Sequence, residues 1–545
     1  MWIGYVLPAG SMATGYICQS SMQSHQATCF VAAAAITSAG GVNPRSHGAS
    51  PSPAEQSHGA LLELIKSCGK QKNLHKARRI HAQILQSQVL DPQDASCSAI
   101  SFSLLQMYSD CGAVTEAQKV LDQLLLPTKT KNHHRYAAAA WSLLIKMYAQ
   151  HGHGERALQC FQKMQENGKE PSLGILVSVL KACSTVAALE QGKQVHKQVV
   201  HKGRETDTFI GTALIDMYAK CGSIEDASTV FRALPNPDIV TWSTIITCFA
   251  QNNDYKSALK FFDDMQIAGF QPNEVTFTCL LSACSHSGRL KEGCEHFKSM
   301  KEKYNIAPTL EHHYVLMEIF GHEALFDEAE DLIESVPFCS NVVGWMSLLT
   351  LCGQHGNINL GRRCFDRAIG IKPGYSSGYA LMWNLYNQAG MCDEARRIDD
   401  LRIIANAWKK PAKAFIEVDN QVHSFIVADK SHPQSDRIYT KLKDLTEKIK
   451  SEGYSPSLGA VPDWSSDRDK EVSLCRHSEK LAIAFGLIST AKGATIRLSK
   501  NLRVCADCHS AAKVISKVEM REIIITDAYQ IHRFKDGTCS CQNFG

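Results

Sequence analysis

The chain has 545 residues, of which 44% are hydrophobic and 21% charged, and its formal net charge is +4. This is the composition of a protein with several globular domains, and it excludes collagen-like or largely disordered chains. No apolar run reaches the length of a membrane span, so we expect no membrane partner. Most of the 21 cysteines stand singly inside helical patterns, which favours packing in a reducing compartment over a disulfide framework.

The first 57 residues are expected to form a leader. Residues 1–54 contain no Asp or Glu, are rich in Ser, Ala, Gly and Thr, and have Arg45 as their only Lys or Arg. This composition resembles an organelle transit peptide, although one Arg fits the mitochondrial amphipathic pattern poorly. A disordered leader without a targeting role is the alternative.

Residues 58–341 contain an internal repeat. Three matches share an offset of 101 residues: Trp141–Ile145 with Trp242–Ile246, Phe161–Met164 with Phe262–Met265, and Ala182–Ser184 with Ala283–Ser285. Three independent matches at one offset indicate a repeat architecture rather than chance.

Each repeat unit is expected to be a pair of antiparallel helices. Apolar residues recur at i, i+3, i+4 and i+7 from Trp141 and again from Ala157, with Gly152 and Gly154 between the two sets. One pair cannot bury its apolar stripe alone, so the pairs are expected to stack into an α-solenoid of about eight repeats. The predicted units are 138–172, 173–207, 208–238, 239–273, 274–309 and 310–341, after a partial triplet over 58–137 with a polar insertion near Thr128–Arg135.

Met217–Gly222 and Val240–Ser243 look like signature stretches of pentatricopeptide repeats. The alternation of long, long and short units resembles the editing type of plant pentatricopeptide repeat proteins, the PLS class. Tetratricopeptide repeats would imply protein ligands, but their Trp-Leu-Gly-Tyr pattern is absent. The resemblance implies that single-stranded organellar RNA is the partner and that each repeat reads one base with its fifth and last residues.

Two units carry readable pairs under this analogy. Thr212 and Asp238 in unit 208–238 favour guanine, and Ser243 and Asn273 in unit 239–273 favour adenine. Asp only accepts hydrogen bonds and suits the donors of guanine, whereas Asn offers a donor and an acceptor. We therefore expect a guanine followed by an adenine in the 5′ to 3′ direction. The pairs in units 173–207 and 310–341 match no standard pair: Val177 with Asp207, and Tyr314 with Asn341.

Residues 342–410 continue the helical pattern and resemble the E-type extension of the family. Phe415–Val418 and Val422–Phe425 alternate like a hairpin with Asp419 and Asn420 at its turn, and a helix is expected over about 436–452. Residues 411–545 then resemble the α/β DYW-type deaminase domain, with a core over about 453–545.

A zinc deaminase motif lies in this core. Such enzymes combine H-x-E with a later P-C-x-x-C; here these are His477 and Glu479, then Cys505 and Cys508, with Val504 in place of Pro. The two motifs at the starts of two helices can converge on one ion. We expect His477 and the two cysteines to hold zinc with the fourth position left to water, and Glu479 to move protons as the catalytic residue.

A second set consists of His509, His532, Cys539 and Cys541. Two His and two Cys are typical of a closed structural zinc site, so two Zn²⁺ ions per chain are expected. The alternative is that one His, first of all His509, is a surface residue. The family usually ends in Asp-Tyr-Trp, whereas the last residues here are Asn543, Phe544 and Gly545, a change that bears on full activity and on binding of accessory editing-factor proteins.

Together these features predict a sequence-specific RNA cytidine deaminase in a mitochondrion or chloroplast. The first alternative is a non-catalytic RNA-binding factor that recruits a deaminase in trans. A reverse, uridine-aminating activity and a protein-binding scaffold are further options.

Overall fold

The computed structural model describes residues 53–86, 95–124, 133–335, 342–408, 411–456 and 467–541. They fall into two compact units, one that ends at Glu205 and one that begins at Thr206. Most of the expected leader, most of the polar insertion and the tail 542–545 lie outside the described residues. The first described helix begins at Pro53, four residues before the expected end of the leader.

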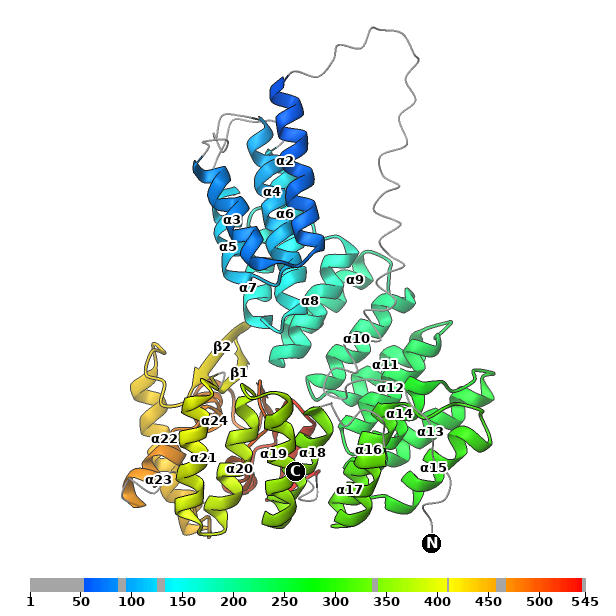
Figure 1. Cartoon of the computed structure of the whole chain (residues 1–545), viewed down its shortest axis with the longest axis vertical. Helices are drawn as coiled ribbons and strands as arrows, with labels where there is room; N and C mark the ends of the chain where they lie inside the picture. Colours follow the sequence, from blue (N-terminus) through cyan, green and yellow to red (C-terminus); the bar gives the residue numbers. More distant parts are fainter. Residues whose placement is uncertain are drawn as a thin grey trace. The chain divides into compact units, whose positions relative to one another are not determined.

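The first unit is built from helical pairs that lie side by side (Figure 1). The repeated apolar positions form its core, since Trp141, Leu144, Ile145 and Tyr148 are all buried, as the helical spacing predicts. Its helices are α2 (Pro53–Lys70), α3 (Leu74–Gln86), α4 (Ala95–Asp110), α5 (Val114–Leu124), α6 (His133–Gln150), α7 (Gly154–Glu166), α8 (Leu173–Val186) and α9 (Leu189–His201).

The second unit begins with further helical pairs. Its helices are α10 (Thr208–Lys220), α11 (Ile224–Ala233), α12 (Ile239–Gln251), α13 (Tyr255–Ile267), α14 (Glu274–His286), α15 (Leu290–Glu302), α16 (Leu310–His322), α17 (Phe326–Ser335), α18 (Val342–His355), α19 (Ile358–Ile371), α20 (Ser376–Gln388) and α21 (Cys392–Ile404). The last residue of one predicted unit caps the first helix of the next, because Asp207, Asp238 and Asn273 each accept a backbone N–H with their side chain. The single cysteines pack as expected: Cys160, Cys183, Cys248 and Cys284 are buried as thiols that are not in disulfides.

The carboxyl-terminal part contains a six-stranded sheet in the order β2-β1-β3-β4-β5-β6. The strands are β1 (Lys413–Val418), β2 (Gln421–Ile426), β3 (Ile496–Lys500), β4 (Ile523–Thr526), β5 (Ile531–Lys535) and β6 (Thr538–Cys539), and the helices are α22 (Ser435–Ser451), α23 (Asp467–Cys475), α24 (Ser478–Ser489) and α25 (Ala506–Val518). The hairpin expectation is confirmed, because β1 and β2 pair antiparallel across Asp419 and Asn420, which have φ of 51° and 59°.

Strands β3 and β4 are the parallel pair, and α25 connects them. Their carboxyl ends therefore lie at one edge of the sheet, the usual place for a site in such folds. Helix α24 packs close to the sheet because Gly486 has no side chain: a Cβ there would lie 2.9 Å from Ile416 Cδ1 and 3.1 Å from Ile496 Cγ2. In the part of the chain that the structure describes, no helix is long and apolar enough to span a membrane.

Candidate metal centres and base-reading positions

The first ligand set, which consists of His477, Cys505 and Cys508, comes together at the starts of two helices. His477 precedes α24 and Cys505 precedes α25, and both have the extended backbone of an N-cap residue. His477 Nδ1 lies 3.5 Å from Cys505 Sγ and 3.4 Å from Cys508 Sγ. A short connection, residues 501–505, joins the end of β3 to α25, and it brings the C-x-x-C to the start of α24.

The donor set fits zinc. With Zn–N near 2.0–2.1 Å and Zn–S near 2.3 Å, tetrahedral geometry places N and S about 3.6 Å apart. The observed separations agree, and the three ligand atoms lie within 4.8 Å of one another. The neighbouring Cys508 and His477 side chains hold the pKa of Cys505 well below its usual range against the effect of burial, which favours the thiolate that a metal needs. Three ligands leave the fourth tetrahedral position open.

Glu479 lies in the first turn of α24 with a fully buried side chain. Ser478 Oγ donates a hydrogen bond to its Oε2 at 2.9 Å, and Lys500 at the end of β3 forms an ion pair with its Oε1. Burial alone would raise the pKa of Glu479, but the Lys500 ammonium outweighs it and lowers the pKa. The carboxylate is therefore held ionised and able to accept a proton.

A buried ion pair joins the two ligand-bearing helices. Lys480 in α24 donates to Asp507 Oδ2 at 2.7 Å, and Asp507 lies between the two cysteines of the C-x-x-C. The Tyr454 hydroxyl donates to Asp507 Oδ1 at 2.7 Å and accepts from Lys480 Nζ at 2.8 Å. All three side chains are buried. In this clamp, formed by Lys480, Asp507 and Tyr454, both charges are paired and hydrogen-bonded, as buried charges need to be. No sequence motif predicts this clamp, and the signal for it is that Lys480 and Asp507 stand close to candidate zinc ligands in the sequence.

Lys480→Met is expected to lower the free energy of unfolding by about 3–5 kcal/mol, because it leaves the Asp507 carboxylate buried without its cation. Urea denaturation measures this loss. Lys517→Met is the matched control, since Lys517 pairs with Glu452 where the side chains are 61% and 44% exposed, and its loss is expected not to exceed about 1 kcal/mol. A double change, Lys480→Met with Asp507→Leu, should recover part of the loss; equal losses for the two single lysine variants would contradict the clamp.

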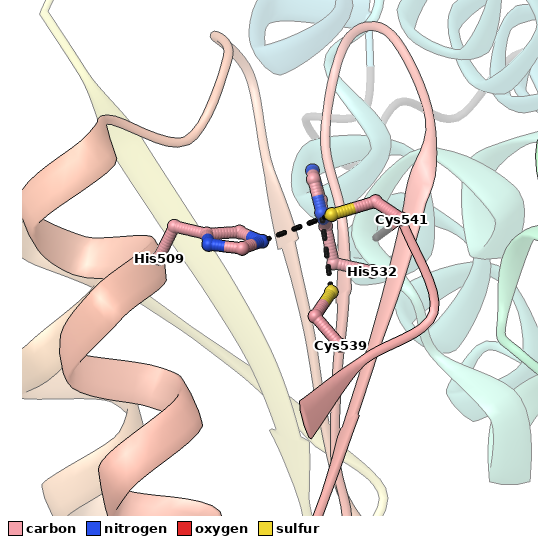
Figure 2. Close-up of side chains that lie close together, drawn as sticks. All are labelled: His509, His532, Cys539 and Cys541. Carbon is pink, nitrogen blue, oxygen red and sulfur yellow. Dashed lines mark hydrogen bonds between the residues drawn. The ribbon is translucent and has the colours of Figure 1, made fainter. Parts of the chain in front are cut away.

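The second set also comes together (Figure 2). His509 lies in the first turn of α25, His532 in β5, Cys539 at the end of β6 and Cys541 two residues later. His509 Nε2 lies 3.1 Å from Cys541 Sγ, and His532 Nδ1 lies 3.7 Å from Cys539 Sγ. The four ligand atoms lie within 4.8 Å of one another, which fits a closed four-ligand site. His509, the first candidate for a surface residue, points into the set in Figure 2.

Electrostatics in the second set also favour a cation. The pKa of Cys541 is lowered to about 2 by the Cys539 thiol and the two imidazoles. Burial alone would lower the pKa of His532, but Asp527 and Cys541 raise it to about 9. The cluster thus shares protons that a metal ion would displace on binding.

Asp527 contacts Nε2 of His532 and so orients the imidazole. Its Oδ2 lies 3.4 Å from His532 Nε2, so Nδ1 is left to face Cys539. Imidazoles that bind zinc through one ring nitrogen commonly donate a hydrogen bond from the other nitrogen to a carboxylate. Asp527 also accepts the backbone N–H of Val504 at 2.9 Å, which ties the second set to the start of the C-x-x-C. Its only sequence signal is an acid directly after the apolar strand β4.

The four predicted base-reading residues lie near the start of the first helix of a repeat, in α10, α12 and α14. Asp238 and Asn273 are the N-cap residues of α12 and α14, and Thr212 and Ser243 lie one turn into α10 and α12. Asp238 is exposed and Asn273 partly exposed, whereas Thr212 and Ser243 are buried. The two members of each pair are linked through a third side chain, Thr241 or Thr276.

Known families match the same parts of the chain. A profile described as the DYW family of nucleic acid deaminases matches residues 453–545, and the E+ motif matches 422–449. Profiles for the PPR repeat match 139–168, 212–235 and 275–304, and one for the PPR repeat family matches 237–286.

Two relatives from Arabidopsis thaliana illustrate the likeness. One pentatricopeptide repeat-containing protein is 37% identical over 89% of this chain and 48% of its own length. Pentatricopeptide repeat-containing protein CRR2, chloroplastic, is 34% identical over 88% of this chain and 72% of its own length. The chain spans about half the length of several such relatives. Among solved structures, PPR10 in complex with an 18-nt psaJ RNA element is 17% identical, with a TM-score of 0.42 over 61% of this chain and 48% of that one.

The repeated helical pairs, the small sheet domain and the long alignments to these relatives agree with one another. The chain therefore belongs to the pentatricopeptide repeat family, with an E+ motif and a carboxyl-terminal DYW-type deaminase domain.

Proposed function

We propose that this protein binds a single-stranded organellar RNA through its repeats and deaminates one cytidine of that RNA to uridine. The observation that carries the proposal is the buried, ionised Glu479 two residues from His477, a ligand of the open three-donor set. A deaminase of this chemistry needs a three-ligand zinc and a glutamate that is not a ligand. Two zinc ions per chain are proposed, one catalytic at His477, Cys505 and Cys508, and one structural at the second set.

The proposed reaction uses the chain's own groups as follows. Zinc bound to the first set would lower the pKa of water towards neutrality. Glu479 accepts the proton of the water that attacks C4 of cytosine, and it passes protons to N3 of the ring and to the departing amino group. A C–O bond forms at C4, the C–N bond breaks, and ammonia leaves. Lys500 and Ser478 hold the Glu479 carboxylate in place, and the Lys500 ammonium favours its ionised form.

An organelle is the proposed location. The composition of residues 1–54 resembles a transit peptide, and several relatives carry the word chloroplastic in their names. Both a chloroplast and a mitochondrion are compatible with these observations. Accessory editing proteins are proposed as further partners.

The full chain is expected to select RNAs with a guanine followed by an adenine from a randomised single-stranded pool. The preference at each position should be about tenfold, the usual value of one well-formed base contact. Sequencing of the bound RNAs measures it. Asp238→Asn should change the guanine to adenine and leave the next position unchanged, because Asn caps a helix as well as Asp does. Enrichment of adenine before guanine, or no preference at two adjacent positions, would contradict the assignment.

A further inference from the structure

A third residue lies between the two members of each base-reading pair. In α12 this residue is Thr241, whose hydroxyl donates to Asp238 Oδ1 at 2.8 Å. The same oxygen accepts the Thr241 backbone N–H, also at 2.8 Å. Both donors use Oδ1, and within the described part of the chain Oδ2 of Asp238 takes no hydrogen bond. The carboxylate is therefore turned so that one oxygen caps the helix and the other faces outward.

Helix α14 repeats the arrangement with an amide. Asn273 Oδ1 accepts the Thr276 backbone N–H at 2.9 Å and the Thr276 hydroxyl at 3.0 Å. A backbone N–H can only bond to the amide oxygen, so the amide orientation follows from chemistry. The Asn273 NH₂ group consequently points away from the helix. Asn273 presents donors alone, although an isolated Asn offers both a donor and an acceptor.

The same threonines also hold the buried member of each pair. Thr241 Oγ1 lies 2.9 Å from Thr212 Oγ1, and Thr276 Oγ1 lies 3.1 Å from Ser243 Oγ. Thr241 and Thr276 are both fully buried. Each threonine thus links the fifth residue of one repeat to the last residue of that repeat, across the boundary between two helices.

A third unit has the same connection with a different side chain. His312 in α16 takes the place of the threonine: its Nε2 lies 3.1 Å from Thr278 Oγ1 and its Nδ1 lies 2.7 Å from Thr309 Oγ1. Thr278 and Thr309 are the fifth and last residues of unit 274–309. Burial lowers the pKa of His312 to about 4, so the imidazole stays neutral and can accept at Nδ1. Three successive units therefore share one linkage, although the linking residue changes.

We propose that Thr241 and Thr276 are positioning residues that set the base specificity of their repeats, an inference that rests on the proposed RNA binding. By holding Oδ1 inward, Thr241 fixes the direction in which the Asp238 carboxylate offers its other oxygen to the N1–H and amino donors of guanine. The Thr276 hydroxyl adds a second hydrogen bond to Asn273 Oδ1 beside that of the backbone N–H, and so strengthens the orientation that offers the NH₂ donors to the N1 acceptor of adenine. Neither threonine contacts the base; each holds the capping residue in the orientation that the base meets.

The experiment compares Thr241→Val and Thr276→Val in the full chain with the randomised RNA pool. Valine keeps the shape and the backbone cap and removes only the hydroxyl. Thr241→Val should reduce the guanine preference by about three- to tenfold, the range of one hydrogen bond, and leave the adenine preference intact. Thr276→Val should do the reverse, so each variant is the control for the other.

Thr241→Ser and Thr276→Ser should restore the parent preferences, which a merely structural role for the methyl group would not predict. Unchanged preferences in both valine variants, or equal losses at both nucleotides, would overturn the inference. If the parent chain itself enriches no RNA, the proposed function fails instead, and the two failures are thus distinguishable.

Discussion

A Glu479→Gln chain is expected to keep its zinc and its RNA affinity but to lose cytidine conversion by about 10²–10⁴-fold or more, the range for removal of a general acid–base group. The amide has nearly the same shape as the carboxylate, but it cannot take the proton of the attacking water. Glu479 is fully buried and lies two residues from His477 of the first ligand set. Conversion is measured by sequencing a bound RNA after incubation with the zinc-loaded protein.

Two further variants separate catalysis from stability in this experiment. Glu479→Gln leaves the Lys500 ammonium without its counter-ion, so a double change with Lys500→Met should regain stability and remain inactive. Glu519→Gln is the control for loss of a carboxylate in the same domain, because Glu519 pairs with Lys441 and Lys448 at the far end of α25. Full conversion by Glu479→Gln would favour the non-catalytic alternative, in which a deaminase is recruited in trans.

Loss of one cysteine from each ligand set is expected to cost one zinc ion in both cases but to affect activity in one case and stability in the other. Cys508→Ser should lower the zinc content from two ions to one and abolish conversion, because the open site loses one of three ligands. Cys541→Ser should also lower the zinc content to one, but with a large loss of stability. Structural zinc is worth about 10 kcal/mol or more of folding free energy in small domains, and the second set joins α25 to β5 and β6.

Metal analysis and thermal unfolding of each variant distinguish the two outcomes. Cys475→Ser is the matched cysteine control, since Cys475 belongs to neither set and its sulfur accepts a weak contact from the Thr446 hydroxyl at 3.8 Å. It should retain two zinc ions. Two ions and an unchanged unfolding temperature in Cys541→Ser would show that the second set is not a structural zinc site.

Much of the fold is predictable from local patterns. The helices follow from apolar residues such as Trp141 and Leu144 at helical spacing, and their pairing follows because an apolar stripe on one helix face must be covered by a neighbouring element. The hairpin of β1 and β2 follows from alternation around Asp419 and Asn420, two residues that tolerate positive φ. Both signals lie within a few residues of the element that they predict, so no long-range contact is needed to find them.

The parts of the site that act through distant partners are not predictable in this way. Lys500 is 21 residues from Glu479 along the chain and reaches it only because β3 ends beside the start of α24. Asp507 and Lys480 form a pair for the same reason. The orientation of the Asn273 amide is a further case, since the amide is ambiguous by itself and the Thr276 contacts fix its oxygen on the helix.

The sequence by itself determined the family, the helical repeats and the candidate ligands, because motif spacing and helical period are properties of a short stretch of chain. His477 and Glu479, for example, are recognisable from three consecutive residues. The tertiary structure decided which charges meet inside the domain and which atom of each capping residue faces outward. Those properties depend on side chains that come from different helices and strands, and burial makes each of their contacts obligatory, since an unpaired charge or polar atom in the core is costly.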